Sequence, residues 1–429
     1  MSISWRVPAV LMAGLIPVVI WPSPLTVTAW SVLVVVAVLV DFLLAPSPHQ
    51  LTVERSDPAP IRVGEESVST VTVTGPKRMR AQMRDAWQPS AGARNNRHSF
   101  SLTPNEPRQL TTVLAPTRRG RLAGDHVTIR SWGPLRLAAK QVSFRVDSVL
   151  RSLPEFPSRK HLPRALAKLQ QVEGQALARR RGQGTEFDSL REWVEGDDVR
   201  SIDWRATARL DEGIIVRTWR PERDRHIAMV MDTSRLAAVR LGNITRLDAQ
   251  MDACLLLGAV CAKAGDTVSF LAGDQSVRAS VIKPGRRDIL RELSHAMTPL
   301  DAGIIEADWT ALANSVTALG TKLSLIVILT PIEPNVLDED LLPVLVNLAK
   351  RNSILIASAV DPETSASPEL YESVSDVYQA AAVARTSLRR QAAATALQQL
   401  GITVVEDTPE QLPMRVVDHY LDLKARGLL

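Results

Sequence analysis

The sequence predicts a mixed α/β protein with an apolar N-terminal segment, a small β-sandwich and then a doubly wound, mainly parallel sheet. Three observations support this prediction: a long uncharged stretch near the N-terminus, period-two alternation in the segment that follows it, and apolar strands alternating with helices from His226 onward. The 429-residue chain is 45% hydrophobic and 23% charged, which excludes a disordered, collagen-like or coiled-coil chain. We divide it into a transmembrane helical hairpin (1–46), a β-sandwich-like domain (47–150), a linker helix with a signature segment (151–225) and a final α/β domain (226–429).

The N-terminal stretch predicts two membrane-spanning helices. No charged residue occurs from Val7 through Val40, a span of 34 residues, whereas one crossing needs about 20. Proline and serine at 22–24 mark a turn, so we expect one helix over 7–21 and a second over 25–45. Asp41 lies near the end of the second helix, where we expect its carboxylate to reach the lipid headgroups. A cleaved signal peptide is the alternative, but the apolar stretch is too long for one and no A-x-A site follows promptly.

Basic residues predict the orientation of this hairpin. Residues 77–130 contain eleven Lys and Arg against three Asp and Glu, a net charge of +8, although the whole chain carries only +5. Because cytoplasmic segments that flank a membrane are enriched in Lys and Arg, we expect the N-terminus and the soluble domains on the cytoplasmic side of the cell membrane. The same basic segment can lie against anionic membrane lipid. It shows no aromatic interleaving and no known nucleic-acid motif, so we expect no nucleic-acid partner.

Alternating segments predict the β-sandwich. Residues 51–55, 67–74 and 126–130 alternate between apolar and polar side chains and are rich in Val and Thr, which is typical of half-buried strands. Proline and glycine turns separate these short strands, as in a small sandwich. We assign this domain no chemistry.

The segment from 151 to 225 begins with a proline-rich linker and a helix over 164–181, and continues with a run that mixes acidic residues, arginine and tryptophan. Such a run cannot be a plain core element, because its charges must pair or face solvent. It is either an ion-paired cap over a sheet edge or a binding surface. Its candidate residues are Glu186, Arg191, Asp197, Asp198, Arg200, Asp203, Trp204 and Arg209.

Within this run we predict separate roles for the charged and aromatic residues. Asp203, Trp204 and Arg209 are expected to pack the segment onto the sheet domain. Arg191 and Arg200 are expected to pair with local carboxylates. The adjacent carboxylates of 197 and 198 could serve acid/base chemistry, but no histidine or nucleophile is tied to them.

The last 200 or so residues, on the scale of one large domain core, alternate between strands and helices. Strands are predicted over 226–231, 267–271, 276–282, 323–329, 353–360 and 402–405, and helices over 245–264, 287–296, 339–350, 375–400 and 410–424. Continuous apolar strands between helices predict a mainly parallel sheet buried on both faces. Cys254 and Cys261 lie seven residues apart and are expected to be a buried, reduced thiol pair.

Asp232 and Ser234 follow the first of these strands, at the sheet edge where ligands bind in such folds. Their oxygens can reach a hard cation. This sequence resembles the von Willebrand factor type A domain, whose metal-ion-dependent adhesion site uses Asp-x-Ser-x-Ser and a later Asp. Leu236 and Thr330 stand at two ligand positions, so the resemblance implies a degenerate site of Asp232, Ser234 and Thr330. We expect no certain cofactor and at most weak magnesium, completed by a partner's carboxylate. Alternatively, Asp232 or Ser234 caps the following segment.

The residues from Gly182 to Arg209, continued by 215–224, resemble the signature of the family catalogued as domain of unknown function 58. That resemblance implies a membrane-bound partner of a MoxR-type AAA+ ATPase and supplies no established activity. The sequence contains no P-loop, G-x-S-x-G or H-E-x-x-H motif. We therefore expect a scaffold or adaptor without catalytic residues. The alternative is a metal-dependent hydrolase that uses the acidic residues of the signature segment.

Overall fold

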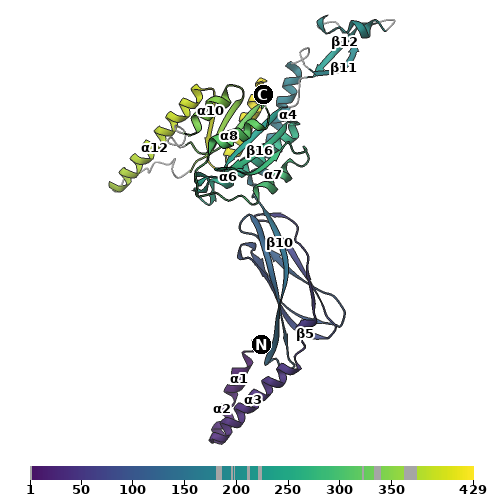
Figure 1. Cartoon of the computed structure of the whole chain (residues 1–429), viewed down its shortest axis with the longest axis vertical. Helices are drawn as coiled ribbons and strands as arrows, with labels where there is room; N and C mark the ends of the chain where they lie inside the picture. The colour runs from purple at the N-terminus through teal and green to yellow at the C-terminus, as the bar shows by residue number, and fades with distance from the viewer. Residues whose placement is uncertain are drawn as a thin grey trace. The chain divides into compact units, whose positions relative to one another are not determined.

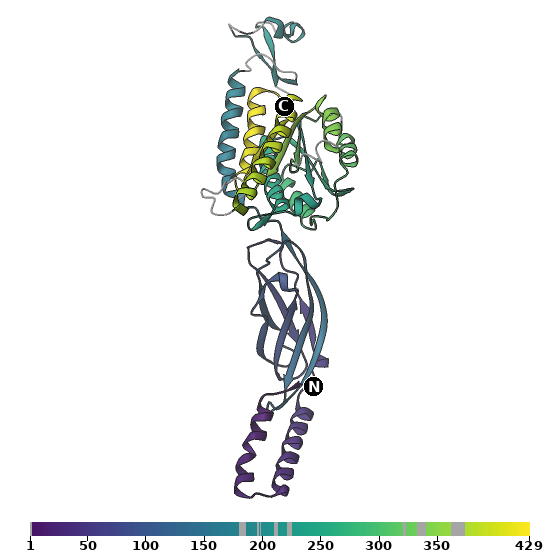
Figure 2. The same cartoon turned by 90° about the vertical axis from the view of Figure 1, so that its left-hand side faces the viewer.

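The computed structural model describes residues 2–179, 186–194, 197, 199–209, 213–220, 225–320, 323–332, 340–361 and 374–429. The chain forms two compact units, Met1–Leu153 and Pro154–Leu429. The first contains the apolar helices and two β-sheets, and the second contains a six-stranded sheet with helices on both faces (Figures 1 and 2).

The N-terminal apolar segment folds into α1 (Arg6–Ala13), α2 (Leu15–Ile20) and α3 (Pro24–Leu44). Among the described residues, only the helical segment that includes α3 is long and apolar enough to cross a membrane, with a mean hydropathy of 2.5. The first predicted span is divided at Gly14 into α1 and α2. The Trp30 indole packs closely against this glycine, since a Cβ at Gly14 would be 2.2 Å from it. The same indole donates a hydrogen bond to the carbonyl of Val10 at 3.2 Å. One apolar helix is therefore established, and a second membrane span stays a prediction.

Two sheets with a common apolar core follow, as the alternating segments predict. The first sheet has the order β1-β10-β9-β5-β7 with β3 paired to β10, and the second has the order β2-β4-β8-β6. Val71 and Val73 of the second sheet and Met83 and Ile129 of the first belong to one buried cluster. The strands are β1 (Ser2–Ile3), β2 (Thr52–Arg55), β3 (Ile61–Arg62), β4 (Ser67–Thr74), β5 (Met79–Trp87), β6 (Ala93–Arg94), β7 (Arg97–Leu102), β8 (Arg108–Leu114), β9 (Gly120–Trp132) and β10 (Ala138–Leu153).

Asp41 joins α3 to the turn between β9 and β10. Its carboxylate accepts hydrogen bonds from the backbone N–H groups of Leu135, Leu137 and Ala138 at 2.7, 2.7 and 2.8 Å. Lys140 donates from Nζ to the carbonyl of Ala45, which follows the last residue of α3, at 2.7 Å. Asp41 is completely buried. The prediction that it reaches the lipid headgroups is therefore wrong, because the turn supplies three donors that take the place of water.

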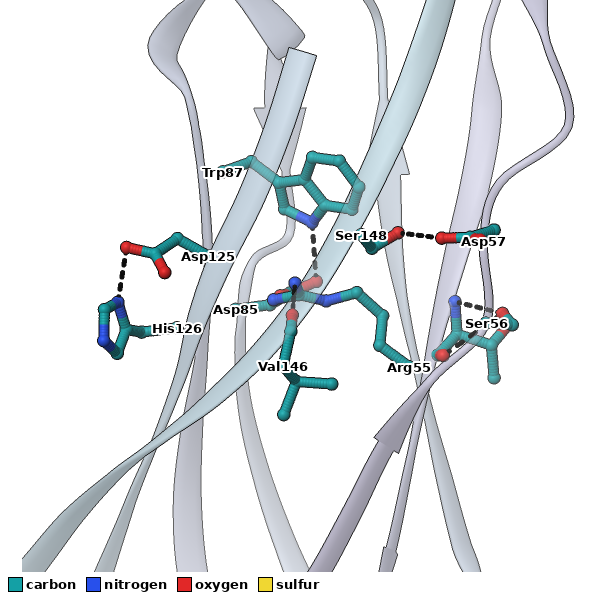
Figure 3. A network of polar contacts seen from close by, with 10 residues as sticks. Arg55, Ser56, Asp57, Asp85, Trp87, Asp125, His126, Val146 and Ser148 are labelled. Atoms are coloured by element: carbon teal, nitrogen blue, oxygen red, sulfur yellow. Dashed lines mark hydrogen bonds and ion pairs between the residues drawn. The ribbon is translucent and has the colours of Figure 1, made fainter. Parts of the chain in front are cut away.

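A buried ion pair crosses the core of the two sheets (Figure 3). The guanidinium of Arg55 lies 2.5 Å from a carboxylate oxygen of Asp85, and neither side chain is exposed. The other oxygen of Asp85 accepts a hydrogen bond from the indole of Trp87 at 2.9 Å, and Arg55 also donates to the carbonyl of Val146. Gly124 leaves room for this group, since a Cβ there would lie 2.8 Å from the Arg55 guanidinium.

The sheet of the second unit has the order β17-β16-β13-β18-β19-β20. Edge strand β17 is antiparallel to β16 and the remaining pairs are parallel. The prediction of a mainly parallel sheet is confirmed. Its strands are β13 (His226–Asp232), β16 (Thr267–Gly273), β17 (Val277–Ile282), β18 (Leu325–Leu329), β19 (Ser353–Ala359) and β20 (Thr403–Asp407).

Helices cover both faces of this sheet, as predicted. Ile227, Met229 and Met231 of β13 pack into one buried cluster, while Ala228 and Val230 pack into another. The first cluster includes α4 (Leu162–Arg179), α6 (Arg246–Ala264), α7 (Ile289–Met297) and α13 (Leu412–Arg426). The second includes α8 (Trp309–Ala318), α10 (Leu342–Ala349) and α12 (Val374–Gln399).

The central helix α6 has a defined start and end and is buried over most of its length. Thr245 and Asp248 form a capping box at its start, and Gly265 ends it in the left-handed conformation at φ 77°. Cys254 and Cys261 on this helix are free and buried, as predicted. Burial raises the pKa of both thiols, so they stay protonated and unreactive.

Candidate functional site

Asp232 stands at the carboxyl end of β13, the strand at which the direction of winding changes. The next strand of this sheet along the chain, β16, lies on one side of β13, and β18 lies on the other. All seven residues of β13 are buried, so this strand runs through the core and ends with Asp232 at the sheet edge. In open α/β sheets ligands bind at this edge, which makes Asp232 the first candidate for a ligand-binding residue.

The carboxylate of Asp232 is already bonded on both oxygens. One accepts from the backbone N–H of Ser234 at 2.8 Å, and the other accepts from the hydroxyl of Thr330 at 2.9 Å. Burial raises the pKa of Asp232, while these hydrogen bonds and the nearby Arg246 guanidinium act in the opposite direction. Ser234 also caps the short 3₁₀ helix Arg235–Ala238 by accepting from the N–H of Leu236. Ser234 therefore has the capping role that the sequence left open between it and Asp232.

This arrangement does not fit a tightly bound magnesium ion. Magnesium needs near-octahedral oxygen coordination, and here both oxygens of the Asp232 carboxylate already accept hydrogen bonds, from Ser234 and from Thr330. The described part of the chain contains no group of three or more His, Cys, Asp or Glu residues that could hold a metal ion. Weak magnesium completed by a partner's carboxylate stays a prediction.

A second buried carboxylate lies near this edge and was missed in the sequence. Asp274 follows β16 directly and accepts hydrogen bonds from the hydroxyl of Thr233 at 3.1 Å and from Arg278 at 3.2 Å. Its position directly after a strand was a usable signal, because it lies one residue beyond Gly273, the register partner of Asp232 on the neighbouring strand. The network links the ends of β13 and β16 and leaves both acids bonded by protein donors.

The signature segment forms an antiparallel hairpin of β11 (Glu186–Glu192) and β12 (Ile215–Arg220). We use the term signature hairpin for the described residues between Glu186 and Arg220. Arg191 pairs with Asp197 at 2.6 Å, as predicted, and Asp197 also accepts from the N–H of Val194 at 3.0 Å. These interactions lower the pKa of Asp197 and raise the pKa of Arg191.

Asp203 has a related role further along the signature hairpin. It caps α5 (Trp204–Thr207) by accepting from the N–H groups of Arg205 and Ala206, and it pairs with Arg217 of β12 at 2.8 Å. The pairing with Arg217 and these backbone hydrogen bonds lower the pKa of Asp203. The local ion pairs therefore brace the hairpin from within.

Several large apolar side chains of the signature hairpin face solvent, whereas Ile215 and Val216 are buried. Trp204 is 67% exposed, which overturns the prediction that it packs the segment onto the sheet domain. The other exposed apolar residues of the hairpin are Leu190, Trp193, Val194, Val199 and Ile214. Among the remaining predicted residues, Arg200 and Arg209 are exposed, Glu186 begins β11, and Asp198 lies outside the described residues.

Comparison with known proteins identifies the family. Residues 189–407 match the family described as "Protein of unknown function DUF58". The chain belongs to this family. The match begins in β11 and extends through β20, so it includes the hairpin strands and the whole parallel sheet. None of the curated proteins matches the chain.

Several solved structures show partial likeness to this DUF58 chain. They include the PapD-like domain 7 of human CEP192 (11% identity, 25% of this chain and 89% of that one, TM-score 0.21). A protein of unknown function from Porphyromonas gingivalis W83 matches at 21% identity, over 25% of this chain and 50% of that one, with a TM-score of 0.21. The CARDB domain of a Pyrococcus furiosus protein matches at 20% identity, over 25% and 91%, with a TM-score of 0.18. Scores this low carry no conclusion about fold or function.

Proposed function

We propose that this protein is a membrane-anchored adaptor that binds a partner protein through its signature hairpin. The observation that carries the proposal is the exposure of Trp193 and Trp204 on a hairpin held in shape by the pairs Arg191–Asp197 and Asp203–Arg217. Tryptophan is enriched at the centres of protein interfaces, and exposed apolar clusters with a polar rim mark interaction sites.

The same ion pairs argue against the hydrolase alternative. Asp197 and Asp203 each bind an arginine and backbone N–H groups, which lowers the pKa of both carboxyls and occupies their oxygens. A general acid needs a raised pKa, and a metal ligand needs free oxygens. We therefore assign these acids to the framework of a binding surface, without catalytic residues.

Support for the anchor comes from α3 and its connections. The helix is apolar along its length, and Asp41 and Lys140 fix its end to the sandwich. Ser2 and Ile3 pair with Ala139 and Ala138 of β10, so the residues before α1 and those after α3 are held by the same sheet. This arrangement favours a two-helix hairpin with the N-terminus and the sandwich on one side. The +8 segment favours the cytoplasm as that side and anionic lipid as a contact.

Support for the partner comes from the family and from the sheet. In chain order the strands of the second unit run 3-2-1-4-5-6 with an antiparallel edge, an order that is compatible with a type A-like domain. The proposed partner is a MoxR-type AAA+ ATPase, which the resemblance of the signature implies. In this proposal the partner binds the signature hairpin, and Asp232 at the sheet edge has no catalytic role.

The test is affinity isolation of the full-length protein from solubilised membranes. Val199→Ser and Trp204→Ser should reduce recovery of the ATPase by about tenfold or more, since interface anchors each contribute 1.4 kcal/mol or more. Val68→Ser, at another exposed valine, in the sandwich, is the matched control and should change nothing. Melting temperatures should stay the same for all three variants. Full recovery with both hairpin variants, or turnover of a substrate by the purified protein alone, would overturn the proposal.

A further inference from the structure

Helix α12 exposes most of its length, although it belongs to the folded second unit. Its C-terminal end is held by Leu397, which is fully buried in the core beside Ile402, and by Ala393. Upstream of these residues the helix runs out beyond the neighbouring helices (Figure 1). A solvent-facing helix is normally polar, yet Val374, Val377 and Leu388 are 74%, 53% and 67% exposed.

These exposed residues form a continuous seam. Val374, Val377, Ala381, Ala384 and Leu388 succeed one another at alternating intervals of three and four residues, and all five are exposed. An apolar 3-4 repeat places its members on one stripe of a helix and is the pattern that packs two helices together. Nothing among the described residues covers this stripe, because each of its members is open to solvent.

The last four positions of the seam have the same pattern in both directions, while Val374 would lie opposite Gln391 at the rim. Four residues separate Val377 from Ala381, and four separate Ala384 from Leu388. When a second copy lies antiparallel about the midpoint of the two alanines, Val377 meets Leu388 and Ala381 meets Ala384. Small residues then occupy the centre, where the helices are closest, and larger ones fill the ends. A surface that complements itself in this way is what an isologous two-fold contact requires.

The flank of the seam is also self-complementary. Tyr378 and Arg385 each lie one position beyond a seam residue, on the same side of the helix, and both are exposed. In the antiparallel arrangement Tyr378 of one copy lies beside Arg385 of the other. The guanidinium can then stack on the phenol ring, which adds a cation–π contact twice across the axis. No two arginines of the flank face each other.

We propose that α12 pairs antiparallel with α12 of a second copy of this chain and so makes the protein a dimer in the membrane. Five seam positions per chain bury less surface than a stable dimer in free solution needs. Anchoring both copies in one bilayer raises their effective concentration and makes a small contact sufficient. The dimer contact does not involve the signature hairpin, so both surfaces can be occupied at once.

The test uses cysteine cross-linking of the full-length protein in membranes. Cys254 and Cys261 are buried, so only introduced thiols react. Val377→Cys and Leu388→Cys, carried on two differently tagged copies expressed together, should give a cross-linked dimer with a short bifunctional thiol reagent. Each variant expressed alone should give at least about fivefold less cross-linked dimer. Thr386→Cys, at an exposed position off the seam, is the matched control and should give none.

A second measurement separates the pairing from its alternatives. Leu388→Asp is placed in the copy that carries Val377→Cys. Because it changes an exposed residue, it should leave the melting temperature unchanged. It should abolish cross-linking of that copy to a second copy carrying Ala384→Cys or Leu388→Cys. Strong cross-linking of Val377→Cys to itself would indicate parallel helices and overturn the proposal. A product with a different protein, or mixed cross-linking no stronger than that of the single variants, would also overturn it.

Discussion

The hydroxyl of Thr330 donates a hydrogen bond to the carboxylate of Asp232 at 2.9 Å, joining the ends of the neighbouring strands β18 and β13. Both side chains are buried. The position at which the resemblance to a type A domain implies an acidic ligand holds a hydrogen-bond donor instead. The consequence is that Asp232 stabilises the sheet edge by accepting hydrogen bonds from its neighbours, and two predictions follow from this contact.

Replacing the donor should destabilise the second unit. Thr330→Val keeps the shape of the side chain but leaves one oxygen of a buried carboxylate unsatisfied, which costs about 1–3 kcal/mol. We expect a fall in melting temperature of roughly 2–4 °C for each kcal/mol, measured by circular dichroism on the detergent-solubilised protein. Thr330→Ser retains the hydroxyl and should lie close to the wild type. Equal stability of Thr330→Val and Thr330→Ser would show that the contact contributes nothing.

Magnesium should not bind tightly at this edge. Isothermal titration calorimetry of the full-length protein with magnesium should show no micromolar site, because the oxygens of Asp232 are engaged by Ser234 and Thr330. The melting temperature should likewise not rise with added magnesium, as it would for a ligand that binds the folded state. A micromolar site that Asp232→Ala abolishes would mean that other residues of the chain complete the coordination.

The buried pair in the sandwich should be far more sensitive to mutation than a surface pair. Asp85→Ala leaves the Arg55 guanidinium buried without its counter-charge, a change that costs about 3–5 kcal/mol. Asp147→Ala removes the same chemical group from the exposed pair with Arg145 and should cost less than about 1 kcal/mol. Thermal unfolding of the two variants measures the contrast. Equal losses would show that burial of the Arg55–Asp85 pair has no energetic consequence.

Asp252 should make stability depend on pH. It lies on α6, accepts from the N–H and hydroxyl of Ser158 at 3.2 and 2.7 Å, and burial raises its pKa from 3.8 to about 6. Glu155 adds to this rise and Lys160 opposes it. Between about pH 4 and 6 the folded state binds more protons than the unfolded state, so the contribution of Asp252 to stability falls as the pH rises through this range.

The corresponding variant tests the sign. At pH 7.5 Asp252→Asn should be more stable than the wild type by up to about 3 kcal/mol, because the cost of burying the charge disappears. Below about pH 4 this advantage should vanish. Asp422→Asn, which alters an exposed pair with Arg426 on α13, serves as the control and should show no such dependence. A stability difference that does not change with pH would contradict the assignment to Asp252.

The proposed membrane orientation predicts the location of the C-terminus. A reporter fused after Leu429 should be active as a cytoplasmic fusion, because the +8 segment follows the apolar hairpin. Changing four or more of the basic residues in 77–130 to glutamate is the informative comparison, since it should reduce the fraction of the protein whose C-terminus is cytoplasmic. A periplasmic or extracellular signal from the unaltered protein would remove the orientation and the cytoplasmic ATPase partner together.

Elements whose signal is local were predictable. The helix with the Thr245 cap and the Gly265 stop differs from its prediction by one residue at its start, and the apolar strands of the parallel sheet were found from hydrophobic runs. Helix α8 was missed because Thr, Asn, Ser and Val lower its helix propensity. Its usable signal was Asp308, which caps the helix, followed by apolar residues at 309, 312 and 316.

Features that depend on residues distant in sequence were not predictable in the same way. Arg55 and Asp85 come from different strands, and nothing near either residue reveals that a pairing buries both. The charges of the signature segment were correctly expected to pair locally at Arg191, since their partners are close in sequence. The exposure of Trp204 was not predicted correctly, because whether a tryptophan is covered depends on the tertiary arrangement around it.

The pairing of β1 with β10 determines the order in which the first unit can be completed. Ser2 and Ile3 leave the ribosome before α3, whereas their partners Ala139 and Ala138 are made well after it. The apolar helices are therefore synthesised, and available to a bilayer, while the edge of β10 that receives β1 does not yet exist. Closing this loop has to wait for β10 and carries an entropic cost. In the proposed membrane-anchored protein the apolar helices can insert first, and the N-terminal strand then closes the sheet as its last piece.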